Sequence, residues 1–95
     1  MLTFDWDQRK ARLNAARHRV HFEEAISVFY DEHAVQFFDD ANSENEDRYV
    51  LLGLSQKMRI LVVVHCERDN GRTIRIISAR KATRTERTFY RGPES

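Results

Sequence analysis

The chain has 95 residues, of which 41% are hydrophobic and 33% charged, and this apolar content is enough for one core without a metal or a disulfide. Only three Gly and one Pro are present, which excludes a disordered, low-complexity or collagen-like chain. We therefore expect residues 1–95 to form a single folded domain.

The formal net charge of +1 conceals two opposed halves of the chain. Residues 1–56 carry six basic and eleven acidic residues, a net charge of −5, whereas residues 57–95 carry ten basic and four acidic residues, a net charge of +6. Residues 9–19 and 80–91 carry five basic residues each. Charge alone favours ordinary solvated helix surfaces as the explanation of this asymmetry, and the alternative is a phosphate-bearing partner on one face.

The cysteine and apolar content indicates the compartment. Cys66 is the single cysteine, and an exported chain this short would usually carry paired cysteines. The first residues offer no apolar segment for a signal peptide. The longest apolar run, Ile60 to Val64, has five residues, far fewer than the roughly 20 of a membrane-spanning helix. We expect a soluble cytoplasmic protein without a membrane partner.

Two helices are expected at the start of the chain. Asp5 to Gln8 resembles a capping box with Asp5 as the N-cap, so the first helix should cover about 7–18. The second helix is indicated by apolar residues at the spacing i, i+3, i+4, i+7 and i+8, namely Phe22, Ala25, Ile26, Phe29 and Tyr30.

From Ala34 onward the apolar pattern has the period of strands. Four strands are expected, at Ala34–Phe38, Arg48–Leu54, Arg59–Glu67 and Thr73–Ala79. Asn70-Gly71, between the last two, is a strong signal for a tight hairpin turn with positive φ at both positions. A two-residue turn fixes the hairpin register, pairing Val64 with Ile77, His65 with Ile76, and Val63 with Ser78.

A last helix follows the strands. Thr83 and Glu86 form a second capping box, which should open a helix to about Arg91, where Gly92-Pro93 ends it. The order is then helix, helix, four strands and helix. The fold class is α+β, with two N-terminal helices, a mostly antiparallel four-stranded sheet and a C-terminal helix.

The segment RIISARKATRTERTFY, residues 75–90, is the strongest candidate for function. It places Arg80 and Lys81 at the end of a strand, directly before the capped helix. Cations are unfavourable at a helix N-terminus unless an anion lies between them, so the arrangement suggests a phosphate pocket. For each charged residue taken singly, a salt bridge or a solvated surface position is an equal alternative.

Histidines and the cysteine have simpler interpretations. His18 and His21 could share a helix face, but the neighbouring arginines would repel a divalent cation, so no metal site is expected. Cys66 and His65 are adjacent on a strand and point to opposite faces, which disfavours a nucleophile–base pair. We expect a packing role for the thiol and a core or semi-core position for His65.

Three aromatic residues could stack on nucleic-acid bases. Core packing is the commoner use of such side chains, and we expect it for Trp6 and Phe89. For Tyr90 the sequence does not decide between base stacking and core packing.

Three blocks together resemble the BrnT family of type II toxins in order and spacing. They are FDWDQRKARLNAARHRVHFEEAISVFYD (4–31), EDRYVLLG (46–53) and RILVVVHCERDNGRTIRIISARKATRTERTFY (59–90). The resemblance covers nearly the whole chain. Each fragment alone is weak, but W-D near the start, F-E-E-A, E-x-R-Y and I-S-A-R-K-A-T in combination are specific.

The resemblance implies a RelE-like fold and a metal-independent endoribonuclease that needs no cofactor and inhibits translation and growth. It also implies a BrnA-like antitoxin that holds the toxin inactive in a hetero-oligomer. Operator DNA would be contacted through this antitoxin alone. On this interpretation Arg48, Arg80 and Lys81 position the RNA phosphate, and His18 or Glu46 transfers the proton. RNA binding would involve Arg84, Arg87 and Tyr90.

The chain departs from the family pattern around the first two helices. Arg19 stands where the family usually has Gly, His21 replaces a typical Ser cap, and Glu32 replaces a typical Pro. The first two departures fall in the turn between the helices.

The rival hypothesis is a non-catalytic RNA-binding or partner-binding module, since charge patterning alone does not separate binding from cleavage. The catalytic hypothesis has one geometric requirement: Arg48 and Arg80 should meet in a single anion-sized hollow beside the final helix.

Overall fold

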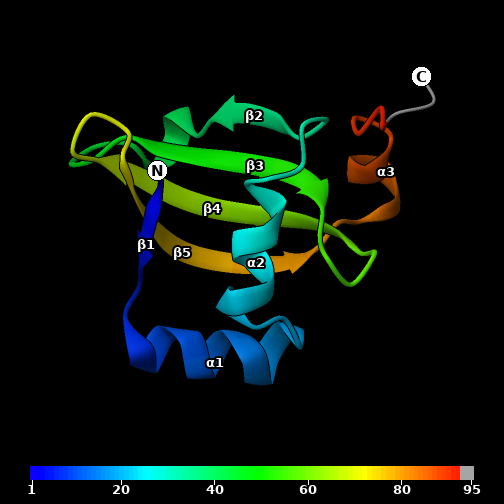
Figure 1. Cartoon of the computed structure of the whole chain (residues 1–95), viewed down its shortest axis with the longest axis horizontal. Helices are drawn as coiled ribbons and strands as arrows, with labels where there is room; N and C mark the ends of the chain where they lie inside the picture. Colours follow the sequence, from blue (N-terminus) through cyan, green and yellow to red (C-terminus); the bar gives the residue numbers. More distant parts are fainter. Residues whose placement is uncertain (93–95) are drawn as a thin grey trace.

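The computed structural model describes residues 1–92, which form a five-stranded sheet in the order β1-β5-β4-β3-β2, with the first two helices on one face and the third at one end of the sheet (Figure 1). In chain order the elements are β1 (Thr3–Asp5), α1 (Gln8–His18), α2 (Phe22–Val28), β2 (Val35–Phe38), a 3-10 turn η1 (Asp40–Asn42), β3 (Arg48–Leu54), β4 (Ile60–Arg68), β5 (Thr73–Lys81) and α3 (Arg84–Arg87). None of the described helices is long and apolar enough to cross a membrane.

The α+β class and the four expected strands are confirmed, but the sheet has a further strand. β1 runs parallel to β5 and pairs Thr3 with Thr73 and Asp5 with Arg75. Asp5 is therefore a strand residue, and the N-cap of α1 is Asp7, whose carboxylate accepts from the backbone N–H of Arg9 and Lys10. A three-residue strand is too short to show a periodicity, which is why the sequence pattern missed it.

The hairpin of β4 and β5 follows the predicted register only next to its turn. His65 pairs with Ile76 as expected, but Val64 pairs with Ser78, and Val63 with Ala79. The pairings Val64–Ile77 and Val63–Ser78 are wrong because the register shifts at Ile77, which has no partner and forms a bulge.

The bulge decides which way the end of β5 faces. It pairs Arg80 with Val62, whereas the unbroken register would pair Arg80 with Leu61. Leu61 belongs to the core beneath α2, and Val62 belongs to the opposite face of the sheet. The bulge therefore places Arg80 on the sheet face opposite α2, where Glu86 of α3 binds it.

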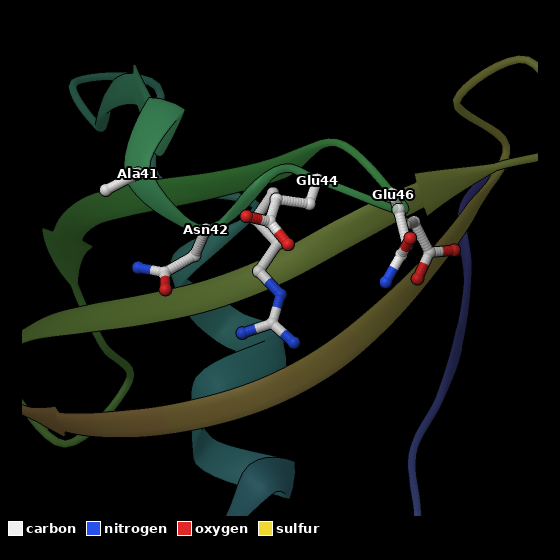
Figure 2. Close-up of a pocket in the computed structure, with 6 residues that line it drawn as sticks. Ala41, Asn42, Glu44 and Glu46 are labelled. Atoms are coloured by element: carbon white, nitrogen blue, oxygen red, sulfur yellow. The ribbon is translucent and has the colours of Figure 1, made fainter.

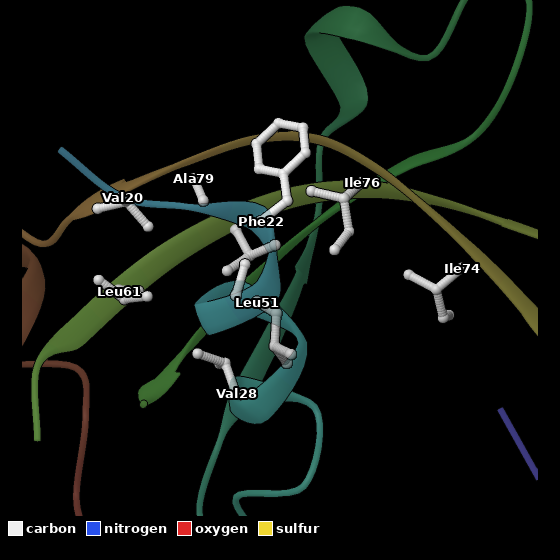
Figure 3. Packing of buried hydrophobic residues seen from close by; sticks show 10 residues of the cluster. Val20, Phe22, Val28, Leu51, Leu61, Ile74, Ile76 and Ala79 are labelled. Atoms are coloured by element: carbon white, nitrogen blue, oxygen red, sulfur yellow. The ribbon is translucent and has the colours of Figure 1, made fainter. Parts of the chain in front are cut away.

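Two apolar clusters cover the two faces. The larger lies between α2 and the sheet, where Phe22 and Val28 pack on Leu51, Leu61 and Ile76 (Figure 3). Trp6 packs against it, edge to face with Phe22 at a centroid distance of 5.7 Å. The smaller cluster, on the other face, consists of Leu52, Val62 and Ala82, with Val50, Ile60 and Tyr90 packed against it.

The edge of β5 is protected where β1 stops. The side chain of Asn14 on α1 is buried; its Oδ1 accepts from the N–H of Ala79 at 3.0 Å, and its Nδ2 donates to the carbonyl of Ala79 at 2.8 Å. This amide occupies the place of a neighbouring strand, so the edge is closed to another chain at this position. It also clamps α1 beside the end of β5.

The turn between α1 and α2 contains two residues that depart from the family pattern, and both are locally unfavourable. Arg19 is in the left-handed conformation at φ 58°, where Gly is favoured, and the His21 side chain makes no cap hydrogen bond. The turn is held instead by Arg59, which donates to the carbonyl of Arg19 and pairs with the buried Glu24. Burial raises the pKa of Glu24, but hydrogen bonds from Arg59 and Ser55 outweigh it and lower the pKa.

The final helix is shorter than expected. The capping box of Thr83 and Glu86 is confirmed, but α3 ends at Arg87 rather than near Arg91. Gly92 has the positive φ of 70° typical of a chain reversal, and Pro93 lies outside the described residues. Phe89 is 57% exposed, so its predicted place in the core is wrong.

Candidate functional site

Cationic side chains gather around one open hollow of about 540 Å³ at the end of the sheet that carries α3. We call it the basic hollow; its lining residues are Arg17, His18, Arg19, Arg80, Lys81 and Thr83. They come from the C-terminus of α1, the end of β5 and the N-cap of α3. The hollow thus brings together three of the predicted catalytic residues, His18, Arg80 and Lys81.

The local folding explains why these residues meet. Cations are favoured at the C-terminus of α1, where the helix dipole is negative. The left-handed Arg19 ends that helix, and the clamp between Asn14 and Ala79 places its end next to Arg80 and Lys81. The result is a concentration of positive charge contributed by segments more than 60 residues apart in the chain.

Most of these charges have no acidic partner. Among residues 1–92, no carboxylate forms an ion pair with Arg17, His18, Arg19 or Lys81. Like charges held this close raise the local potential, because they lie within one Debye length of each other. Such a hollow attracts a phosphate or another polyvalent anion.

Arg80 differs from its neighbours because it has a carboxylate partner. Its Nη1 and Nη2 donate to Oε1 and Oε2 of Glu86 at 2.7 and 2.8 Å. These bonds from Arg80, together with the capping bond from Thr83, lower the pKa of Glu86 to about 2. From the sequence, an anion was expected between Arg80 and the N-terminus of α3. The carboxylate of Glu86, which lies on α3, is this anion.

The pair leaves part of Arg80 available. In the described residues its guanidinium also donates from Nη1 to the carbonyl of Lys81 at 3.4 Å. A guanidinium has five N–H donors, so the Nε hydrogen and one Nη2 hydrogen are without a partner. One edge of Arg80 can still bind a phosphate oxygen while Glu86 holds the other edge.

The predicted meeting of Arg48 with Arg80 is wrong. Arg48 pairs with Cys66 on β4, and Arg80 pairs with Val62, four residues further along the same strand. At the rise of a β-strand this separates the two by about 13 Å along the sheet. Because alternate residues share a face, both side chains nevertheless lie on the face opposite α1 and α2.

Glu46 also lies far from the basic hollow. It lines a separate polar pocket of about 360 Å³ together with Ala41, Asn42, Glu44, Asn45 and Arg48 (Figure 2). Its carboxylate pairs with Arg68 at 2.9 Å, and this bond lowers the pKa of Glu46. A carboxylate so held is a weaker base, and the register gives it no contact with Arg80.

The residues predicted to bind RNA lie on or after α3. Arg84 and Arg87 are exposed, and Arg87 donates to the carbonyl of Ala82 at 3.4 Å. The Tyr90 hydroxyl donates to Asp31 at 2.8 Å. Burial, followed by this bond to Asp31, raises the pKa of Tyr90 to about 12. Tyr90 therefore fastens the chain after α3 to the loop after α2.

Sequence reasoning missed two members of the hollow, Arg17 and Arg19. The five basic residues of 9–19 were the available signal. Because such charges are also typical of a solvated helix, the sequence does not show which of them line the hollow. Phe37 and Phe89 were also missed as exposed aromatics; they are 42% and 57% exposed.

His65 is confirmed as a core residue and takes no part in the hollow. It is fully buried on the α2 face, where Phe29 meets it edge to face and Tyr49 stacks on it. Its ring nitrogens make no hydrogen bond within residues 1–92, and Glu67 lies 3.8 Å from Nε2. Burial lowers the pKa of His65.

Comparisons with known proteins bear on the family and on the fold. A family model described as "Ribonuclease toxin, BrnT, of type II toxin-antitoxin system" matches residues 6–86. The crystal structure of the Brucella abortus ribonuclease toxin, BrnT, is similar with a TM-score of 0.67 at 20% sequence identity, over 88% of this chain and 100% of that one. No curated protein matches the sequence.

Proposed function

Because the chain belongs to the BrnT family of ribonuclease toxins of type II toxin–antitoxin systems, we propose that it is a metal-independent, RelE-like endoribonuclease whose reaction centre is the basic hollow. The observation that carries this proposal is that His18, Arg80 and Lys81 line one hollow. The unpaired Arg17 and Arg19 surround them. The setting is the cytoplasm, in keeping with the single buried thiol of Cys66.

The hollow can supply the charge that RNA cleavage needs. Attack of the 2′-oxygen on the adjacent phosphorus builds negative charge on the phosphoryl oxygens. Lys81 and the free edge of Arg80 stabilise this charge, with Arg17 and Arg19 adding to the potential. Removing one such group costs about 2 to 4 kcal/mol, by analogy with oxyanion-hole donors.

His18 is the better of the two candidates for proton transfer. Histidine titrates near neutral pH and accepts the 2′-hydroxyl proton as the O2′–P bond forms. The P–O5′ bond then breaks, the 5′-oxygen takes a proton from a water molecule in the open hollow, and the resulting hydroxide takes back the proton held by His18. The products are a 2′,3′-cyclic phosphate and a 5′-hydroxyl. The geometry favours His18 over Glu46, which is held by Arg68 at the other end of the sheet.

The remaining predicted residues extend the RNA path. Arg84 and Arg87 contact flanking phosphates beside α3, and Arg48 contacts a phosphate further along the same sheet face. Tyr90 acts through its bond to Asp31, which positions the chain after α3.

The test uses purified protein and protein-free single-stranded RNA, with and without EDTA. We expect cleavage that EDTA does not change, and products that end in a cyclic or 3′-phosphate. Lys81→Ala should lower the rate about 100-fold, while Arg72→Ala, an exposed arginine in the β4–β5 turn, should not change it. Cleavage that requires a divalent ion would overturn the mechanism. Intact RNA bound with a steep salt dependence would show the non-catalytic module instead.

We further propose that a BrnA-like antitoxin inhibits the protein by laying an acidic segment across the basic hollow, in a hetero-oligomer that reaches operator DNA through the antitoxin. In the complex, Lys81 should be protected from amine acylation, and Lys10 at the start of α1 serves as the exposed reference. Equal labelling of Lys81 in the free and complexed protein would place the inhibitor elsewhere.

A further inference from the structure

A second, apolar recess lies on the sheet face opposite α1 and α2, between β2 and α3. We call it the aromatic groove; it has a volume of about 200 Å³ and is lined by Phe37, Val50, Leu52, Val62, Glu86 and Phe89. Its floor is aliphatic. Its two rings, Phe37 and Phe89, are partly exposed and stand nearly perpendicular at 83°, with centroids 6.3 Å apart. An exposed ring pair over an apolar floor suits a flat, aromatic ligand.

The groove and the basic hollow share one wall. Arg80 lines the hollow and pairs across the sheet with Val62, which lines the groove. Glu86 lines the groove and holds the guanidinium of Arg80. A ligand that fills both places must carry an anion next to a flat apolar ring, which is the chemistry of a nucleotide.

Glu86 gives the groove its one polar, hydrogen-bonding wall. Its Oε1 accepts from Arg80 and from the N–H of Thr83, while its Oε2 accepts from Arg80. A carboxylate has about four acceptor positions, so Oε2 can accept one more hydrogen bond. An exocyclic amino group, such as N4 of cytosine, fits this position, whereas O4 of uracil would face a carboxylate oxygen.

We propose that the aromatic groove is a nucleobase subsite of the RNA site, in which one base stacks on Phe89 with the perpendicular ring of Phe37 at its edge, and in which Glu86 favours cytosine over uracil. The proposal rests on the proposed function for the basic hollow. It assigns base selection to a part of the molecule that is distinct from the cationic residues.

The test measures binding of short single-stranded oligodeoxycytidine and oligodeoxyuridine, which lack the 2′-hydroxyl and are not cleaved. We expect oligodeoxycytidine to bind the wild-type protein more tightly. Phe89→Ala should weaken its binding about tenfold, since one base stack is worth about 1 to 3 kcal/mol. The dependence on salt should stay the same, because the phosphate contacts are retained. Glu86→Gln should remove the preference for cytosine.

Phe38→Ala is the matched control. Phe38 is a 50% exposed phenylalanine on the same strand as Phe37, but it pairs with Tyr49 and points to the α2 face. Phe38→Ala should bind both oligonucleotides like the wild type. Phe89→Leu, which keeps the apolar surface without the ring, checks that the loss comes from stacking. A circular-dichroism melt shows that each variant is folded.

Several results would overturn the subsite. One is the same affinity for the two oligonucleotides, and another is wild-type affinity in both Phe37→Ala and Phe89→Ala. If these variants lose affinity for purified antitoxin but not for oligonucleotide, the groove holds a protein side chain. If the preference for cytosine is present but wild-type protein leaves RNA intact, the ribonuclease proposal fails and the base subsite stands.

Discussion

The two ends of the sheet carry similar numbers of cations but treat them differently. At the end that holds Arg48, two guanidiniums are neutralised, Arg68 by Glu46 and Arg75 by Asp5. At the end that holds α3, no carboxylate of residues 1–92 pairs with a cation of the basic hollow, except Glu86 with Arg80. The first arrangement joins strand ends, and the second leaves a positive potential in place for an incoming anion. Among the described residues, two ion pairs neutralise guanidiniums at the first end, whereas in the basic hollow only Arg80 is paired, with Glu86, and this difference in pairing distinguishes the two.

The largest effect of a substitution is expected at Arg80, which both lines the basic hollow and forms an ion pair. Arg80→Ala removes a phosphate contact and should lower RNA cleavage about 100-fold. It also leaves Glu86 without its ion pair and should lower the free energy of unfolding by about 1 kcal/mol, after allowing for solvent screening. Cleavage assays and a denaturant titration measure the two effects. Unchanged cleavage together with a lower stability would assign Arg80 to the fold alone.

Between about pH 5 and 7 the pH dependence of stability should come from the buried histidine, whereas at lower pH the carboxylates with lowered pKa values, such as Glu86, add to it. The pKa of His65 is lowered in the folded protein, so below its unfolded value, near pH 6.5, the unfolded chain binds more protons. Stability should be full above that pH and fall on acidification by up to about 1.4 kcal/mol per pH unit. Glu67 is the facing charge. His65→Phe should flatten the profile of melting temperature against pH between about pH 5 and 7.

Smaller effects are expected from a substitution of Arg19, which should raise the stability of the fold and weaken RNA binding. Arg19→Gly relieves the left-handed conformation and should stabilise the fold by about 1 kcal/mol. It also removes one cation from the hollow and should weaken RNA binding. The matched variant His21→Ser should supply the missing cap, stabilise by about 1 kcal/mol, and leave RNA binding unchanged. Equal RNA binding in both variants would exclude Arg19 from the hollow's function.

The smallest effect is expected at the neutralised end. Arg68→Ala breaks a half-exposed pair with Glu46 and should change the free energy of unfolding only slightly, because solvent screens the pair. RNA cleavage should stay at the wild-type rate. A large loss of cleavage would mean that the two ends have been assigned the wrong roles.

The helices and strands were predicted from the sequence more accurately than the tertiary contacts between them. Arg48–Leu54 was predicted with its observed bounds, because apolar residues fill a strand-length segment between polar loops. The capping box of Thr83 and Glu86 was visible because both of its partners are local. The hollow depended on contacts over long sequence separations, and these carry no local signal.

Two particular residues mark that limit. The unpaired Ile77 shifts the register and sends Arg80 to the open face, yet nothing in its local pattern indicates a bulge. Glu86 was recognised as a cap, but its second role as the partner of Arg80 required the strand end and the helix to meet. The expectation that Arg48 and Arg80 share one hollow was wrong for the same reason, since strand register decides it.

The most direct test of the account is the salt dependence of binding to uncleavable single-stranded oligonucleotide. Each phosphate contact to a single strand contributes about 0.7 to the slope of log affinity against log salt concentration. The double variant Arg17→Ala/Lys81→Ala should lower that slope by about 1.4, if each cation contacts one phosphate. Arg68→Ala/Arg75→Ala should leave it unchanged. A slope that falls in the second variant and not in the first would contradict the assignment of the phosphate site to the basic hollow.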